Sequence, residues 1–208
     1  KKWTARFEEL LETPEAAEPV PVEQEHTALI TFTTGSSGTP KGADRSHRFL
    51  AAQHYAIDGC LPYEKSDLDL PVFPIFSLNN LAAGVTTILP AINVAEPADN
   101  DAYVLYTQII GENITTLTLN PSLLNGLNKY CLEKGKTLPG LRRVAAGGAA
   151  VSRDVVEEFK KIAPNAELVV MYGSTEAEPM THITGQEMLA QRSVTEDDPE
   201  LVDAGVNV

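Results

Sequence analysis

The chain has 208 residues, enough for one sizeable hydrophobic core or two small lobes, and 43% of them are hydrophobic, which is typical of a globular protein and not of a disordered one. Its formal net charge of -13 argues against a nucleic-acid-binding surface, because phosphate backbones repel an acidic protein. An anionic ligand would have to be held by local groups.

The two cysteines lie far apart, and the sequence has no signal-like start and no apolar run long enough to span a membrane. We therefore expect a cytoplasmic setting, with no disulfide and no structural metal. Residues 1–25 predict an acidic N-terminal segment and linker, since seven glutamates and three prolines interrupt any apolar pattern.

Residues 26–185 predict an ATP-binding α/β core, because short apolar runs alternate with helical periodicity from Ala28 onward. This pattern favours a layered parallel or mixed β-sheet flanked by helices. Beyond Gln186 the residues are polar and acidic, so residues 186–208 predict a weakly ordered or truncated acidic tail.

The first element of this core is a predicted strand over Ala28–Thr33, and a helix is predicted to begin at a serine cap, Ser46, and to end near Asp58. Between them, residues 33–42 hold three glycines, five hydroxyl side chains and one lysine. Their backbone N–H groups and hydroxyls can converge on a polyphosphate, and the lysine adds positive charge. The alternative is a flexible linker, which rarely joins an apolar strand directly to a capped helix.

The Walker A loop is the closest alternative phosphate-binding motif, with the pattern G-x-x-x-x-G-K-[ST]. Pro40 stands where that motif needs a glycine before the lysine, and Gly42 stands where it needs the magnesium-binding hydroxyl. A P-loop kinase or GTPase is therefore disfavoured. The chain also has no G-x-S-x-G elbow, which disfavours an esterase.

Further along the chain, Asn120 and Pro121 predict the start of a helix whose leucines recur on one face. A short strand is predicted over Arg142–Ala146, and Ser152 is expected to cap the helix that follows it. Leu168–Met171 predicts the next strand. The four histidines are scattered, and we interpret them as structural.

The phosphate-binding stretch, T-T-G-S-S-G-T-P-K-G, is very similar to the phosphate loop of the adenylate-forming superfamily, which includes acyl-CoA synthetases, peptide synthetase adenylation domains and luciferases. Residues 172–176, Y-G-S-T-E, resemble the Y-G-x-T-E motif of the same superfamily. The resemblance spans residues 28–185 and implies the central part of the large N-terminal domain of an AMP-dependent synthetase.

The resemblance implies a role for each matching residue. Catalytic roles fall to Lys41 at the phosphates, Thr175 at the α-phosphate and Glu176 as the Mg²⁺ ligand, and Tyr172 would stack on adenine. The implied nucleotide-binding set is Thr33, Thr34, Gly35, Ser36, Ser37, Gly38, Thr39, Lys41, Gly148, Ala149, Ala150, Tyr172, Gly173 and Thr175. The alternative for residues 172–176 is a simple turn after a strand, and for residues 147–150 it is helix packing by small side chains.

Residues 72–77, V-F-P-I-F-S, resemble a segment that lines the acyl pocket in the superfamily, with Ser77 in place of the usual histidine. By this resemblance Phe76, Ser77 and Met171 would contact the acid. The sequence is most similar to fatty-acyl synthetases and to the β-lactone synthetases of bacterial olefin biosynthesis. This implies activation of a fatty or β-hydroxy acid as an acyl-adenylate, with ATP and Mg²⁺ as cofactors and a thiol such as CoA, or cyclisation, as the next step.

Complete relatives carry a ribose-binding aspartate, a hinge and a C-terminal domain with a catalytic lysine after the Y-G-x-T-E motif, and none of these can be placed before Val208. We therefore expect the chain to need missing N- and C-terminal parts for full activity and to be weakly active or inactive alone. The alternative is a non-catalytic nucleotide-binding or interaction module that retains the phosphate loop without the lid.

Overall fold

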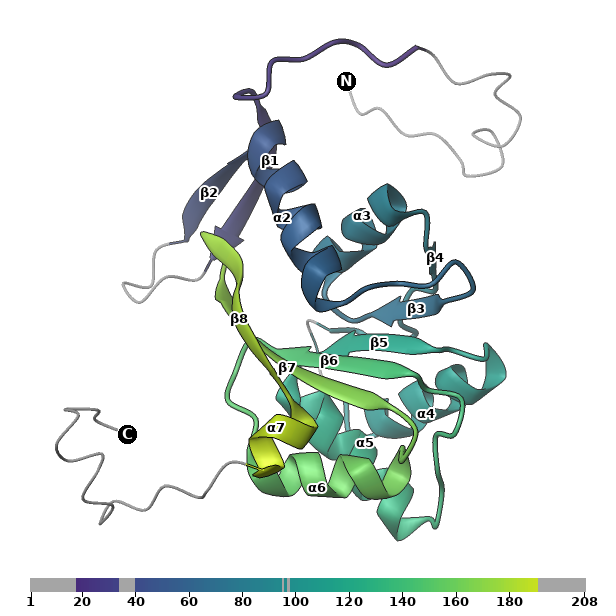
Figure 1. Ribbon diagram of the computed structural model, residues 1–208. Coiled ribbons are helices and arrows are strands. Elements are labelled where there is room, and N and C mark those ends of the chain that lie inside the picture. The colour runs from purple at the N-terminus through teal and green to yellow at the C-terminus, as the bar shows by residue number, and fades with distance from the viewer. Residues whose placement is uncertain (1–17, 34–39, 95, 97, 191–208) are drawn as a thin grey trace, which may run out of the picture.

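A six-stranded sheet forms the centre of the protein, as the computed structural model shows for residues 18–33, 40–94, 96 and 98–190 (Figure 1). Its strand order is β4-β3-β5-β6-β7-β8; the first five strands are parallel, and β8 is antiparallel to β7. The predicted mixed sheet is therefore confirmed. The strands are β3 (Leu68–Pro71), β4 (Thr86–Thr87), β5 (Thr116–Leu119), β6 (Arg143–Gly147), β7 (Glu167–Ser174) and β8 (Ala177–Thr184).

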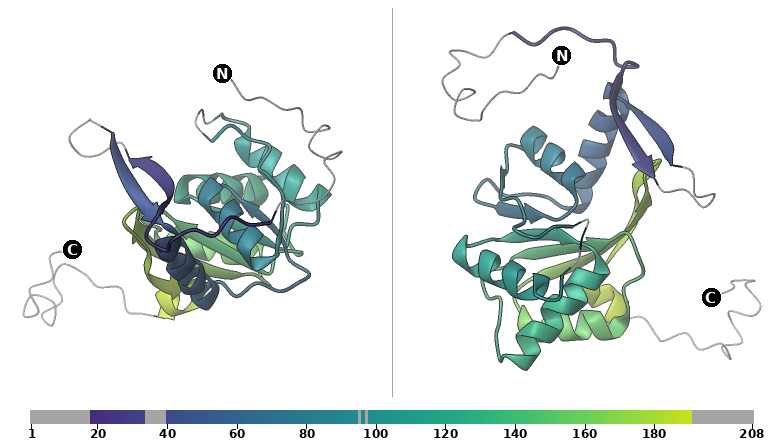
Figure 2. Two further views of the ribbon diagram at one scale, coloured as in Figure 1. Left: turned by 90° about the horizontal axis from the view of Figure 1, so that it is seen from above. Right: turned by 180° about the vertical axis from the view of Figure 1, so that it is seen from behind.

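Helices cover both faces of this sheet (Figures 1 and 2). On one face lie α2 (His47–Cys60) and α3 (Pro74–Ala83); on the other lie α4 (Asp101–Gly111), α5 (Pro121–Glu133), α6 (Arg153–Ile162) and α7 (Gly185–Ala190). Because successive strand side chains point to opposite faces, Val144 and Ala146 of β6 join the larger core while Ala145 packs under α2 and α3. Burial on both faces explains the apolar runs of the central strands.

Three predicted helix caps are confirmed. The Asn120 side chain accepts a hydrogen bond from the N–H of Leu123 at 2.8 Å, and Pro121 occupies the first turn of α5. Ser46 and Ser152 cap α2 and α6 in the same way. Each cap satisfies an N–H group that the helix itself leaves unpaired.

The predicted succession of strand, loop and helix around the phosphate loop was incomplete. A second strand, β2 (Lys41–Ser46), pairs antiparallel with β1 (Thr27–Thr33), so that the loop joins two strands of a hairpin. Its sequence, K-G-A-D-R-S, has no apolar alternation, and its strand conformation comes from backbone pairing with β1. The antiparallel strand β8 was not predicted for a similar reason, since it is polar, contains a proline and is only partly buried.

The remaining sequence predictions concern the ends of the chain. Residues 185–190 form α7, whereas residues 1–17 and 191–208 lie outside the described residues, so the proposed segment boundaries stay a prediction. Among the helices in the described part of the chain, none has the length and apolar character needed to cross a membrane.

Candidate functional site

The carboxyl ends of β3, β5, β6 and β7 meet at one edge of the sheet. After β3 the chain enters α3 on one face, whereas after β5 and β6 it enters α5 and α6 on the other face. Such a change of face between neighbouring parallel strands opens a crevice beyond their carboxyl ends, and ligands of open α/β sheets bind there. A ligand site is therefore expected at this edge.

A cavity with about 440 Å³ of empty space, including its open mouth, lies at this edge. Residues from four segments that are distant in the sequence share its wall, around positions 73–76, 118, 145–148 and 171–179. Those predicted from the sequence are Phe76, Gly148, Met171, Tyr172 and Gly173. The fold therefore brings predicted acid-binding and nucleotide-binding residues around one space.

Two consecutive glycines, Gly147 and Gly148, line the cavity. A Cβ atom on Gly147 would lie 2.8 Å from the carbonyl oxygen of Met171 on the neighbouring strand, which is closer than such atoms can approach. Gly148 has a φ of +84°, a conformation that favours glycine, and it faces the ring of Phe73. These two contacts give a physical reason for glycine at both positions.

Thr175 and Glu176 form the turn between β7 and β8. Glu176 is exposed, and hydrogen bonds from the Ser174 hydroxyl and from its own backbone N–H hold its pKa below the ordinary value. The positive charges of Arg45 and Lys41 lower this pKa further. The charge of Lys41, the lysine of the predicted phosphate loop, thus reaches the predicted metal ligand.

The β1–β2 hairpin lies beside the tip of the β7–β8 hairpin (Figure 1). Thr33 and Lys41 are partners in the β1–β2 register, so the two ends of the phosphate loop sit opposite each other. Residues Thr34 to Thr39 lie outside the described residues, and their predicted contacts stay a prediction.

Arg45 is a residue of this region that sequence reasoning missed. It is 3% exposed, its Nη2 donates to the carbonyl oxygen of Thr175 at 2.8 Å, and its Nη1 donates to Oε1 of Gln53 at 3.2 Å. One buried cation thus joins β2, directly after the phosphate loop, to the turn that carries Glu176. Arginine is rarely buried to this extent. Its burial here depends on the fold, so the sequence gives no signal for it.

The wall of the cavity includes further residues that the sequence did not single out. Phe73 packs against the smaller apolar cluster and also lines the cavity. Thr118 and Glu178 were not considered, because their contact with the site depends on strand register. Ser77, Ala149 and Ala150 are not among the residues that line this cavity.

The histidines are scattered in the sequence, but His182 has a neighbour in the structure. Its Nδ1 lies 3.2 Å from the Sγ atom of Cys60 at the end of α2. Burial raises the pKa of the Cys60 thiol, which disfavours the reactive thiolate. Cys60 and Cys131 are both free thiols, and Cys131 is buried in the larger core.

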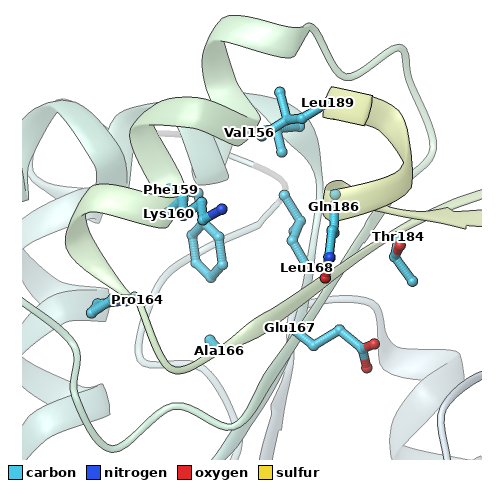
Figure 3. A pocket seen from close by; sticks show the side chains of 11 residues that line it. Val156, Phe159, Lys160, Pro164, Ala166, Glu167, Leu168, Thr184, Gln186 and Leu189 are labelled. Atoms are coloured by element: carbon cyan, nitrogen blue, oxygen red, sulfur yellow. The ribbon is translucent and has the colours of Figure 1, made fainter. Parts of the chain in front are cut away.

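A second pocket lies between α6, β7 and α7, on the opposite face of the sheet from α2 and α3 (Figure 3). Figure 3 shows the ring of Phe159 and the side chain of Leu168 in its wall, with Lys160 and Glu167 near its edge. The residues that line this pocket include no predicted site residue. The chemistry suggested by the sequence therefore belongs to the cavity at the strand ends.

Comparison with known proteins gives the same assignment. The family model for AMP-binding enzymes matches residues 1–205. The chain belongs to the AMP-binding enzyme family. Among its relatives in that family, olefin β-lactone synthetase of Stenotrophomonas maltophilia is 35% identical over 173 residues, covering 83% of this chain and 31% of that protein.

A long-chain-fatty-acid–CoA ligase of Thermus thermophilus is 33% identical over 170 residues, covering 80% of this chain and 31% of the ligase. The chain thus spans about a third of the length of these AMP-binding relatives. The inhibitor-bound N-terminal domain of FACL13 from Mycobacterium tuberculosis superposes with a TM-score of 0.72 at 21% identity, covering 88% of this chain and 46% of that one. These matches confirm the resemblance to the adenylate-forming superfamily and the N-terminal-domain fold.

The predicted magnesium site depends on few carboxylates. Across the described ranges, no three His, Cys, Asp or Glu side chains converge as a metal site. A magnesium ion bound with nucleotide needs only one or two carboxylates, because phosphate oxygens and water complete its coordination. Glu176 is exposed and its lowered pKa keeps it anionic, so it fits such a site.

Proposed function

We propose that this chain forms the ATP- and acid-binding core of an AMP-forming carboxylic acid ligase, whose substrate is a fatty or β-hydroxy acid. The observation that carries the proposal is that the charge of Lys41 reaches Glu176, on the turn that follows Tyr172, while Phe76, Met171 and Tyr172 line one cavity. A cation, an anionic metal ligand and an apolar cavity are the three features that joining a carboxylate to a nucleotide requires.

In the proposed reaction, a carboxylate oxygen attacks the α-phosphorus of ATP. The bond from this phosphorus to the bridging oxygen breaks, and pyrophosphate leaves with the electron pair. Lys41 and the loop around it would hold the β- and γ-phosphates, and Thr175 would hold the α-phosphate. Glu176 would bind Mg²⁺, which when present neutralises charge on the phosphate oxygens.

The walls of the cavity suit the two organic groups. The ring of Tyr172 is 66% exposed and offers a face for adenine, with Gly148 allowing close approach from β6. Phe76 and Met171 are buried and give the acid an apolar surface. The product would be an acyl-adenylate, which a thiol such as CoA or an internal hydroxyl could then attack.

The test is ATP binding by the chain with Lys41→Ala, measured by calorimetry in the presence of Mg²⁺. Loss of a charge-assisted contact to phosphate should weaken binding by about tenfold or more. Lys160→Ala, in the second pocket, is the matched control and should leave the affinity unchanged. Equal affinities for the unmodified chain and Lys41→Ala would contradict the proposal.

Catalysis needs a separate measurement. Because the chain spans about a third of its relatives' length, we propose that adenylation at normal rates requires further parts of the enzyme. Carboxylate-dependent ATP–pyrophosphate exchange at such rates by this chain alone would refute that statement. Pyrophosphate release across a panel of fatty and β-hydroxy acids, measured with the full-length protein, would define the substrate class.

A further inference from the structure

Glu178 places a carboxyl group in the wall of a mainly apolar cavity. Among the described residues that line the cavity, it alone carries a formal charge, and its neighbours in the wall include Phe73, Phe76, Met171 and Pro179. A carboxylate in such surroundings is costly unless hydrogen bonds replace the water that it loses. Any ligand that fills the cavity must therefore accommodate Glu178.

The protein itself satisfies this carboxylate only weakly. Gln53 Nε2 donates to its Oε2 at 3.5 Å, which is long for a hydrogen bond, and Oε1 accepts none from the residues that the structure describes. Arg45 is close, but its two hydrogen bonds go to Gln53 and Thr175. Burial raises the pKa of Glu178, and the charge of Arg45 opposes that rise.

Glu178 also stands close to the proposed reaction centre. It follows the metal ligand Glu176 by two residues, and a Cβ atom on Gly173 would lie 3.3 Å from its Cγ atom, so the side chain packs directly against the nucleotide-binding motif. If the acid lies along Phe76 and Met171 with its carboxyl group toward Glu176, Glu178 would stand beside the carbon atoms next to that carboxyl group. The inference that follows therefore rests on the proposed function.

We propose that Glu178 selects acids that carry a hydrogen-bond donor, a hydroxyl or an ammonium group, on the carbon atoms next to the reacting carboxyl. An unsubstituted chain would strip water from Glu178 without replacing its hydrogen bonds, and sites of this kind discriminate strongly against such analogues. An acid with a hydroxyl or ammonium group would instead donate a hydrogen bond to Glu178, in addition to the one from Gln53.

The test uses stable acyl-adenylate mimics, in which a sulfamate replaces the phosphate, binding to the chain in a calorimeter. Four mimics carry decanoate, the two enantiomers of 3-hydroxydecanoate, and 3-aminodecanoate. The unmodified chain should bind one hydroxy form and the amino form about tenfold to a hundredfold more tightly than the unsubstituted form. Glu178→Leu should abolish both preferences, Glu178→Gln should retain only a reduced hydroxyl preference, and the exposed control Glu157→Gln should change neither.

The outcomes separate this inference from the proposed function. Equal and tight binding of all four mimics by the unmodified chain would keep the adenylation site and overturn the role of Glu178. A hydroxyl preference that persists in Glu178→Leu would also overturn it. Failure of every mimic to bind would refute the proposed function, and this inference with it. Binding of the unsubstituted mimic by Glu178→Leu shows that this variant is folded.

Discussion

Replacing Arg45 with methionine tests whether the two hairpins of the site depend on each other. Methionine fills a similar volume but removes the donors that hold the Thr175 carbonyl and Gln53 Oε1 at 2.8 and 3.2 Å. Each charge-assisted hydrogen bond contributes about 1.5–3 kcal/mol, and the cost of burying the guanidinium offsets part of their sum. We therefore expect Arg45→Met to lower the free energy of unfolding by about 3 kcal/mol.

Urea unfolding followed by circular dichroism measures this change. With a slope of about 2–3 kcal/mol per M for a protein of this size, the midpoint should fall by roughly 1 M. Arg45→Lys should give an intermediate loss, because lysine keeps the charge but lacks the planar fork that reaches two acceptors.

The same substitution should affect nucleotide binding, although Arg45 does not line the cavity. Without this contact the turn that carries Thr175 and Glu176 loses its anchor to β2, so Mg²⁺-dependent ATP binding should weaken under conditions where the variant is folded. An unchanged urea midpoint together with unchanged ATP affinity would refute the reasoning.

Two further predictions concern the sheet. Asp67 accepts hydrogen bonds from Arg142, the Thr115 hydroxyl and a backbone N–H; burial acts to raise its pKa, but these bonds outweigh it and lower the pKa. The stability that Asp67 contributes is thus present above about pH 4 and is lost as the pH falls through its lowered pKa. At pH 7, Asp67→Asn should lower the free energy of unfolding by about 3 kcal/mol. In unfolding experiments at acid pH, this difference from the unmodified chain should shrink. Gly147→Ala should lower the free energy of unfolding by about 1–3 kcal/mol, because its new Cβ meets the Met171 carbonyl. In the control Gly140→Ala, the new Cβ meets no atom within 4 Å, so this variant should be as stable as the unmodified chain. Equal melting temperatures for the two variants in thermal unfolding would contradict the prediction.

Much of the fold was predictable because its signals are local. The caps at Ser46, Asn120 and Ser152 act on N–H groups within three residues, and the apolar runs of β6 and β7 reflect burial on both faces of a parallel sheet. The resemblance of residues 33–42 and of the Y-G-S-T-E segment to motifs of the adenylate-forming superfamily is also local, because it lies in runs of consecutive residues. Family membership required nothing beyond the order of these motifs.

Strands β2 and β8 could not be predicted in the same way. Their polar sequences carry no periodic apolar signal, and the backbone partners that hold them, β1 and β7, supply the strand conformation. Strand pairing depends on hydrogen bonds between segments, and a one-residue change of register would move every side chain to the other face. The sequence of one strand does not contain that register.

The motifs along the chain thus predicted the adenylate-forming family, and they predicted roles for Lys41 and Glu176 that stay predictions. Only the tertiary structure decided that Lys41 and Glu176 share one electrostatic environment, that Arg45 is buried between their hairpins, and that Glu178 enters the wall of the cavity. The physical reason is that charge interactions and burial depend on distance in space, which the pairing of β7 with β8 and the packing of α2 against β8 establish.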